Sequence, residues 1–226
     1  MSYLNFHFDE ILIRSKLKKY ESPNRLSMHH KHFIHSAVVL LIIPNNEKPY
    51  DLFMIQRTKR ENDKHSGEMS FPGGKFEPEK DKDYLDTALR ELEEEVGIPR
   101  IKINVLGCID DHLTPKGFII TAFVASVNET QKMKKQDEEV QEILRIPINF
   151  FANKSNYKER TYYLNGDLIG VGKFNYRSPN NHKRYVIFGA TSHIIVNYIK
   201  QVYDLQLKTP VCRRVTCSDL KEKILR

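Results

Sequence analysis

Apolar positions along this chain of 226 residues fall into runs with two different periods. Residues 37–43 form a continuous apolar run, which is typical of a strand buried on both faces. A turn rich in Pro and Asn at residues 44–49 ends this run. Further strands are predicted from their apolar content at residues 52–57, 101–109 and 118–127.

Apolar residues at helical spacing predict helices in three parts of the chain. Residues 1–20 predict an amphipathic helix that ends near Pro23, and residues 191–205 predict a longer one. The central helix is defined by five apolar residues at core spacing, which are Leu85, Ala88, Leu89, Leu92 and Val96.

Two segments carry a weaker pattern. Residues 140–146 fit either a short helix or a strand, and residues 147–151 begin another element. Residues 153–184 contain Asn165 and Gly166, a pair that is typical of a tight turn, and predict a hairpin with loops.

This mixture of strands with two substantial helices favours an α/β (α+β) fold in which a mixed β-sheet is covered by helices on both faces. A chain of this length suits one domain with extensions. We expect an N-terminal extension with a helix at residues 1–35, one principal domain at residues 36–206 and a C-terminal tail at residues 207–226.

The formal net charge of +7 favours anionic partners by electrostatic steering. A nucleotide with several phosphates explains this charge as well as a nucleic acid does. Lys and Arg are scattered along the sequence, without a basic stripe interleaved with aromatic residues and without a nucleic-acid motif. The charge alone does not decide between the two, but without such a stripe or motif nucleic acid is the less expected partner.

The sequence also bears on the compartment. The longest apolar run is too short to span a bilayer, and the N-terminus lacks the features of a signal peptide, so no membrane association is expected. Three cysteines, Cys108, Cys212 and Cys217, are few and odd in number. A reducing, cytoplasmic setting is the simplest interpretation.

The most informative feature is a cluster of acidic residues on the central helix. Glu91, Glu94 and Glu95 stand at i, i+3 and i+4, so their carboxylates share one face of the helix, away from its apolar stripe. Acidic helix faces are often only solvated, but three adjacent carboxylates repel each other, and Arg90 offers local relief by reaching Glu94. This pattern favours a site that holds Mg²⁺ against a polyphosphate.

The same segment resembles the Nudix box, G-x5-E-x7-R-E-U-x-E-E-x-G-U, where U is a bulky aliphatic residue. Lys82 stands where the box has its first Glu, and Gly74 lies two residues farther from Arg90 than the box requires. Asp81, Asp83 or Asp86 could supply the missing acid. The second half matches at Arg90, Glu91, Leu92, Glu94, Glu95, Gly97 and Ile98.

Segments outside the box resemble the coenzyme A diphosphatase branch of this family. Residues 56–74 are similar to its signature, with Arg57 in the position of a signature Arg and Lys64 or Arg60 available for a second one. Residues 113–118 resemble its Thr-Pro-x-Gly-Phe loop. Taken singly, these residues could be ordinary surface cations or residues that shape turns. Their joint occurrence around the acidic helix carries the resemblance, which covers roughly residues 36–205.

The resemblance implies a Nudix-type α/β/α sandwich and a metal-dependent diphosphatase. Mg²⁺ or Mn²⁺ is expected at Glu91, Glu94 and Glu95, Arg90 is expected to orient a neighbouring Glu, and Glu139 is expected to act as a further ligand or as the base. Catalytic roles therefore fall on Arg90, Glu91, Glu94 and Glu139. Substrate contacts are expected from Arg57, Lys64, Gly73, Gly74, Thr114, Lys116 and Phe118.

The expected reaction is hydrolysis of coenzyme A or its derivatives to 3′,5′-ADP and 4′-phosphopantetheine. A Nudix hydrolase of ADP-ribose, dinucleotides or capped RNA shares the same box chemistry, and a Nudix domain that binds nucleotide or RNA without cutting it is the alternative outside enzymes. The His-rich residues 29–35 contain no interleaved acid or Cys and are interpreted as a surface segment. Residues 1–35 could act as a dimer arm or a lid, so the sequence leaves open whether the protein is a homodimer.

Overall fold

The computed structural model of the protein describes residues 5–59, 66–209, 212–213 and 215–220. Its central strand, β1 (Ile34–Ile43), contains the apolar run identified in the sequence. Alternate side chains of β1 enter two separate cores, because Leu40 and Ile42 belong to one cluster of buried residues and Val39 and Leu41 to the other. A strand that contributes to two cores needs apolar residues at every position, which explains the unbroken run.

The neighbours of β1 make the sheet mixed, as predicted. β7 (Phe118–Ser126) runs parallel to β1 along nearly its whole length. On the other side, β4 (Gly73–Lys75) and β2 (Asp51–Arg57) pair antiparallel with the beginning and the end of β1, respectively. The eight-stranded sheet of the described residues is completed by β3 (Met69–Ser70), β5 (Asn104–Cys108), β6 (His112–Leu113) and β8 (Val140–Pro147).

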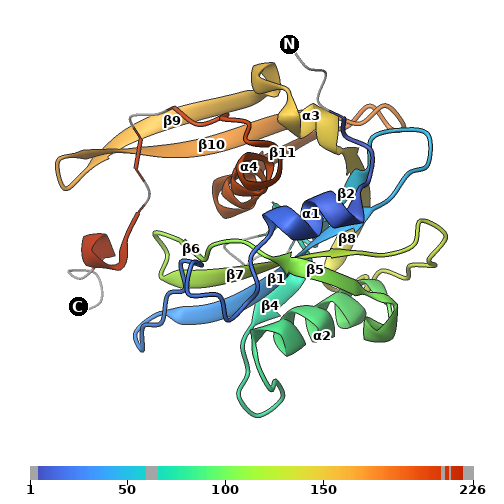
Figure 1. Ribbon diagram of the computed structural model, residues 1–226, viewed down its shortest axis with the longest axis horizontal. Helices are drawn as coiled ribbons and strands as arrows, with labels where there is room; N and C mark the ends of the chain where they lie inside the picture. The colour runs from blue at the N-terminus through green and yellow to red at the C-terminus, as the bar shows by residue number, and fades with distance from the viewer. Residues whose placement is uncertain (1–4, 60–65, 210–211, 214, 221–226) are drawn as a thin grey trace.

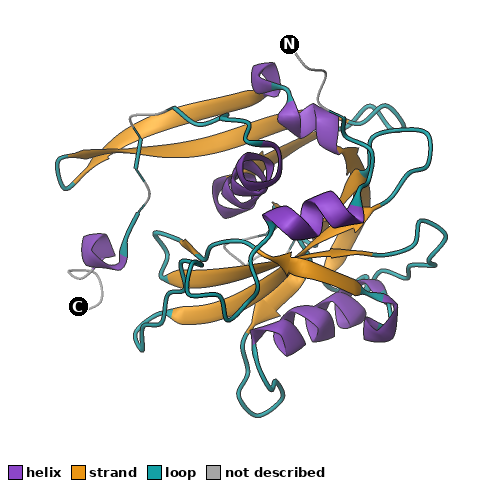
Figure 2. Ribbon diagram, viewed as in Figure 1, coloured by secondary structure: helices purple, strands orange, loops and turns teal. Residues whose placement is uncertain are grey.

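Helices cover both faces of this sheet (Figures 1 and 2). α2 (Tyr84–Val96) packs against one face, and α1 (Glu10–Lys16) and α4 (Gly189–Tyr203) lie on the other. The protein is therefore an α/β/α sandwich with a mixed sheet, which confirms the predicted fold class. No helix among the described residues is long and apolar enough to cross a membrane.

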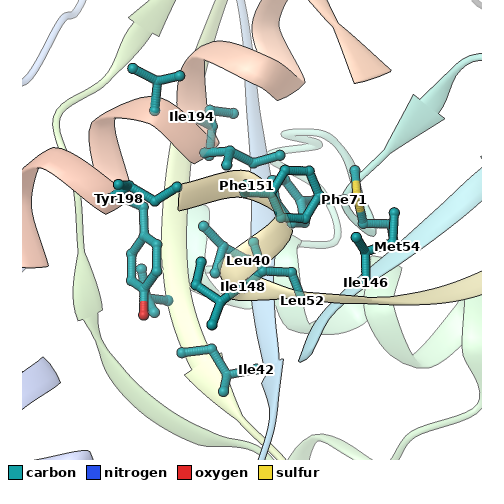
Figure 3. Close-up of a cluster of buried hydrophobic side chains, with 14 of the residues drawn as sticks. Leu40, Ile42, Leu52, Met54, Phe71, Ile146, Ile148, Phe151, Ile194 and Tyr198 are labelled. Carbon is teal, nitrogen blue, oxygen red and sulfur yellow. The ribbon is translucent and has the colours of Figure 1, made fainter. Parts of the chain in front are cut away.

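The larger core lies between the sheet and α4 (Figure 3). Figure 3 shows Leu40 and Ile42 of β1 in the same cluster as Ile194 and Tyr198 of α4. The Tyr198 hydroxyl is satisfied inside this core, because it lies 2.7 Å from the hydroxyl of Tyr50. Burial of each such side chain stabilises the fold by about 1.5–3 kcal/mol, so α4 is a structural part of the domain.

A second sheet covers α4 on the side away from the first. Its strands are β9 (Tyr157–Leu164), β10 (Asp167–Arg177) and β11 (Arg184–Phe188), in the order β11-β10-β9. The predicted hairpin is confirmed for β9 and β10, whose turn has positive φ at Asn165 and Gly166. The third strand was not predicted. It belongs to this sheet because its alternate residues are buried in the core shared with α4.

The N-terminal segment is shorter in helix than predicted and is held by a buried ion pair. α1 ends at Lys16 because the chain then extends, and Lys18 forms a β-bridge with Cys108. Farther on, an Nη1 atom of Arg25 lies 2.6 Å from Oδ1 of Asp111, and the two side chains are only 2% and 1% exposed. The remaining elements of the described chain are short. They are the helix α3 (Ile148–Ala152) and three 3-10 helices at Arg100–Lys102, Lys154–Asn156 and Cys217–Leu220.

We expect Asp111→Ala to lower the free energy of unfolding by about 3–5 kcal/mol, because the Arg25 charge would stay buried without its carboxylate. Urea unfolding followed by circular dichroism measures this change. Lys80→Ala serves as the control, because it removes an ion pair whose side chains are 59% and 40% exposed and should leave the unfolding midpoint unchanged. Equal midpoints for Asp111→Ala and the wild type would contradict a stabilising role for the buried pair.

Candidate metal and diphosphate site

The acidic helix α2 begins and ends where its sequence specifies. The side chain of Asp83 caps its N-terminus by accepting a hydrogen bond of 2.8 Å from the Asp86 amide. Gly97 ends it with a left-handed φ of 66°. Ala88 and Leu92 are fully buried against the sheet, which fixes the rotation of the helix and hence the direction of its acidic face.

Arg90 organises the polar side of α2 through bonds to three carboxylates. Its Nε donates to Oδ1 of Asp81 at 2.7 Å and its Nη2 donates to Oδ2 of the same residue at 3.1 Å. Its Nη1 donates to Glu91 and to Glu94, both at 2.9 Å. The predicted contact between Arg90 and Glu94 is therefore present, and Asp81 completes the arrangement as a two-point partner.

Asp81 is the acidic residue of the loop before α2 that binds Arg90. Of the three candidates, Asp83 caps α2 and Asp86 pairs with Arg100, whereas Asp81 alone holds Arg90. The Arg90 hydrogen bonds lower the pKa of Asp81 to about 2. The buried Thr87 hydroxyl also donates to Asp81, at 3.0 Å. Sequence reasoning missed Thr87; its position six residues after Asp81, at the start of a helix, was the only available signal.

Glu95 lies beneath this network and is 2% exposed. Its Oε2 accepts a hydrogen bond of 3.0 Å from the backbone amide of Gly73 on β4. Burial raises the pKa of Glu95 to about 8, and Arg57 opposes this shift only in part. The described residues form no salt bridge with Glu95. A buried carboxylate in these surroundings fits the chemistry of a cation ligand.

Glu91 is half-buried and packs against the Gly-rich strand. A Cβ atom added to Gly74 would lie 2.3 Å from Oε1 of Glu91, so this position accepts only glycine while Glu91 keeps its place. Burial raises the pKa of Glu91, and the nearby charge of Glu139 adds to the increase. Glu94, by contrast, has a side chain that is 56% exposed.

Arg57 and Glu139 lie on the same side of the sheet as this cluster. Arg57 ends β2 and pairs with Val140 at the start of β8, and the Thr58 amide donates to the Glu139 carbonyl at 2.9 Å. Glu139 is exposed and acts electrostatically on both Glu91 and Glu95. The fold thus brings Arg57, Glu139 and the two glycines together around the carboxylates of α2.

The loop with Thr114, Lys116 and Phe118 occupies a different place. It joins β6 to β7, and the Thr114 hydroxyl accepts from the Phe118 amide at 3.0 Å. Phe118 of β7 pairs with Ile34 at the start of β1. Gly74 of β4 pairs with Ala37, which lies three positions farther along β1, on the other side of this strand. The loop therefore lies about 10 Å from the glycines along the strand direction. Lys64 and Arg60 lie outside the described residues.

The carboxylates are not grouped as a closed metal cage. Among the described residues, no three His, Cys, Asp or Glu side chains are close enough together to hold a metal ion as they stand. Arg90 holds Glu91 and Glu94, and Glu95 turns toward Gly73. The donor set nevertheless fits Mg²⁺ or Mn²⁺, which bind few carboxylates at once and use hard oxygen ligands.

Comparison with known proteins defines the family. The model of the NUDIX domain matches residues 34–164, more than half of the chain. Two curated relatives share the name "Uncharacterized Nudix hydrolase NudL". The one from Photorhabdus laumondii subsp. laumondii is 32% identical over 189 residues, which are 84% of this chain and 94% of the relative. The one from Yersinia enterocolitica is 33% identical over 168 residues, which are 74% of this chain and 81% of the relative.

A solved structure, a MutT/nudix family protein from Enterococcus faecalis, superposes with a TM-score of 0.49 at 16% identity over 80% of this chain and 66% of that one. By the family match and the relatives, the chain belongs to the Nudix hydrolases. It is an enzyme of the class that hydrolyses phosphoanhydride bonds, and members of this class generally use divalent metal ions.

We expect the pairing of Asp81 with Arg90 to make the fold sensitive to acid. Because the pKa of Asp81 is lowered to about 2 in the folded state, its contribution is complete above the unfolded pKa of about 4 and is lost as pH falls toward 2. The contribution is about 2 kcal/mol. Unfolding free energies measured between pH 6 and pH 2.5 should therefore fall less steeply in Asp81→Asn than in the wild type. Parallel curves would contradict this assignment.

We expect Gly74→Ala to reduce hydrolysis of nucleotide diphosphates at least about tenfold, because the new methyl group displaces Glu91 from its position. Steady-state assays with added Mg²⁺ or Mn²⁺ measure the loss. Lys75→Ala changes the exposed next residue of the same strand and should keep near-normal activity. Full activity in Gly74→Ala would show that the place of Glu91 is not required.

Proposed function

We propose that this Nudix hydrolase cleaves the diphosphate of coenzyme A or its derivatives and releases 3′,5′-ADP and 4′-phosphopantetheine. The proposal is carried by one observation, the convergence of Arg57, the two glycines of β4 and Glu91 at one end of the sheet. Arg57 and residues 71–74 come from the segment that resembles the coenzyme A diphosphatase branch. The relatives' names do not include a substrate, so the substrate rests on this resemblance.

In the proposed mechanism, Glu91, Glu94 and Glu95 would hold Mg²⁺ or Mn²⁺, and the ion would supply positive charge against the diphosphate and lower the pKa of the attacking water. Arg90 orients Glu91 and Glu94 through its hydrogen bonds at 2.9 Å. The water oxygen forms a bond to one phosphorus of the diphosphate. The bond between that phosphorus and the bridging oxygen breaks, and the bridging oxygen leaves with the second phosphate. Glu139 accepts the proton of this water; if Glu139 is instead an additional ligand, the proton passes to the leaving phosphate or to solvent.

The substrate is positioned by groups on both sides of β1. We assign Arg57 and Lys116 to the phosphates, together with Lys64, which lies outside the described residues. The backbone of Gly73 and Gly74 allows close approach to the diphosphate, because side chains there would collide with their neighbours. The loop of Thr114 and Phe118 is proposed to contact the part of the substrate beyond the diphosphate.

The surrounding organisation is proposed on the same basis. We retain residues 1–35 as an N-terminal extension, residues 36–206 as the Nudix hydrolase domain and residues 207–226 as a C-terminal tail. A cytoplasmic location is the proposed setting, and the assembly is left open between a monomer and a homodimer. Sedimentation velocity of the purified chain distinguishes a monomer from a dimer.

The substrate is tested with a panel of coenzyme A, acetyl-coenzyme A, ADP-ribose, diadenosine polyphosphates and capped RNA. The purified protein is incubated with Mg²⁺ or Mn²⁺, and the products are identified by mass spectrometry. We expect coenzyme A to be cleaved with the highest kcat/KM, giving 3′,5′-ADP. Preference for another member of the panel would reject the substrate while keeping the enzyme class, and binding without cleavage of any member would indicate a non-catalytic domain.

Two isosteric variants of α2 test the proposed ligands. Glu94→Gln should lower turnover more than roughly 100-fold, because even the partners of metal ligands cost 10–100-fold when they are changed. Glu93→Gln is the matched control, since Glu93 lies next to it on the helix but pairs with Arg100. Near-full turnover in Glu94→Gln, or an equal loss in both variants, would reject the proposed ligand face.

A further inference from the structure

The outer face of the second sheet presents side chains that the fold leaves uncovered. Side chains alternate along a strand, so the residues of β11 that point away from α4 are Arg184, Val186 and Phe188. Tyr185 and Ile187 between them are buried. In Figure 1, α4 lies on the inner side of β9 and β10, and these strands form the border of the molecule.

This outer face is strongly basic. Ten of its positions on the three strands (158, 160, 162, 171, 173, 175, 177, 184, 186 and 188) carry no acidic residue. The same face continues at the hairpin end to Ile169, which is buried, and to Asp167, whose carboxylate is paired with Arg213. None of its cations forms a salt bridge or a side-chain hydrogen bond with the described residues. We call this surface the basic face; its five cations are Lys158, Arg160, Lys173, Arg177 and Arg184.

The cations of the basic face stand opposite each other across the strands. In the register, Lys173 pairs with Lys158, and Arg177 pairs with Arg184. Like charges directly opposite in an antiparallel sheet destabilise it. Elsewhere in this protein arginines such as Arg90 are matched with carboxylates. The unmatched pairs are therefore a charge arrangement that an anionic ligand would neutralise.

Aromatic rings lie among these cations. Tyr162 is 53% exposed and Phe188 is 44% exposed, and Phe188 stands directly opposite Lys173. An open recess of about 490 Å³ is lined by Asn175, Val186 and the opposed arginines Arg177 and Arg184, together with Tyr176 and Tyr185. Exposed rings on a sheet stack bases, and the flanking cations contact phosphates.

We propose that the basic face binds single-stranded RNA. An antiparallel sheet with exposed aromatic residues and cations is a common platform for unpaired bases, and the Asn175 amide can hydrogen-bond a 2′-hydroxyl. An acidic peptide would have no bases for Tyr162 and Phe188 to stack on, and extended peptides join sheet edges rather than faces. A membrane surface is usually bound by amphipathic helices with an apolar face, which this sheet does not present.

The site is separate from the proposed diphosphate site. α4 and the first sheet lie between the basic face and α2 (Figure 1). The sequence-based expectation against nucleic acid as a partner depended on the absence of a basic stripe with aromatic residues. Such a stripe forms only when three strands align, because its cations are spread over residues 158–184. RNA binding can therefore be tested independently of hydrolysis.

The test measures fluorescence anisotropy of a labelled single-stranded RNA of about 15 nucleotides with the full-length protein, a length that suits one such binding surface. We expect binding that weakens with salt. In Arg177→Glu/Arg184→Glu, the affinity should fall at least about tenfold, and the slope of log K against log salt should decrease by about 1.4, at roughly 0.7 per lost phosphate contact. Hydrolysis of the nucleotide panel should be unchanged.

Two matched controls distinguish an effect of the basic face from an effect of the overall charge of the protein and from the loss of any exposed aromatic ring. Lys102→Glu/Lys132→Glu makes the same change in charge at exposed positions elsewhere and should alter the affinity less than about twofold. Tyr162→Ala should weaken binding at least about fivefold through lost stacking. Tyr163→Ala, on the opposite face of the same strand and 81% exposed, should not.

Several results would overturn the proposal. These are the absence of RNA binding at low salt with about 10 μM protein, an equal loss in the two charge-reversal variants, and unchanged affinity in Tyr162→Ala. Competition by polyglutamate as strong as by RNA would indicate only a non-specific polyanion site. Tighter binding of single-stranded DNA of the same sequence, or of phosphatidylserine vesicles, would assign the face to that partner instead.

Discussion

The pairing of Arg90 with Asp81 is the interaction on which the acidic helix depends. Three carboxylates within one turn repel each other, and a single arginine can relieve them only if its guanidinium is held in place. Asp81 holds it from the opposite side with two hydrogen bonds, and is itself fixed by the Thr87 hydroxyl. Glu91 and Glu94 are thereby directed to one side, while Glu95 is held by a backbone amide of β4.

The long strand β1 connects this helix to the rest of the molecule and gives the protein two unlike surfaces. One face of its sheet is covered by α2. The glycines of β4 pair closely with β1, and because Gly74 has no side chain, Glu91 can lie directly against it. The other face receives α4, which is enclosed by the second sheet. The carboxylates of α2 and the basic face therefore lie on opposite sides of the first sheet and of its two cores, so the two proposed ligands would not compete for the same place.

The local sequence pattern was sufficient to predict elements with a strong apolar pattern of their own. It was insufficient for elements whose burial depends on distant parts of the chain. β1 was predicted from its unbroken apolar run, and α2 from apolar positions at helical spacing. β11 was not, since its burial depends on α4, which follows it in sequence. In the site, Glu91 and Arg90 follow from helical spacing, but the choice of Asp81 depends on how the loop before α2 folds back. The burial of Glu95 depends on β4, which no helix periodicity reveals.

The proposed hydrolysis depends on the carboxylates of α2 as ligands of a divalent cation. Electron paramagnetic resonance of Mn²⁺ titrated into the wild-type protein and into Glu91→Gln, without nucleotide, tests this directly. We expect the wild type to remove free Mn²⁺ from solution with one set of sites, and Glu91→Gln to bind it at least about tenfold more weakly. Equal binding by both proteins, or no binding by the wild type, would contradict a metal site on this helix.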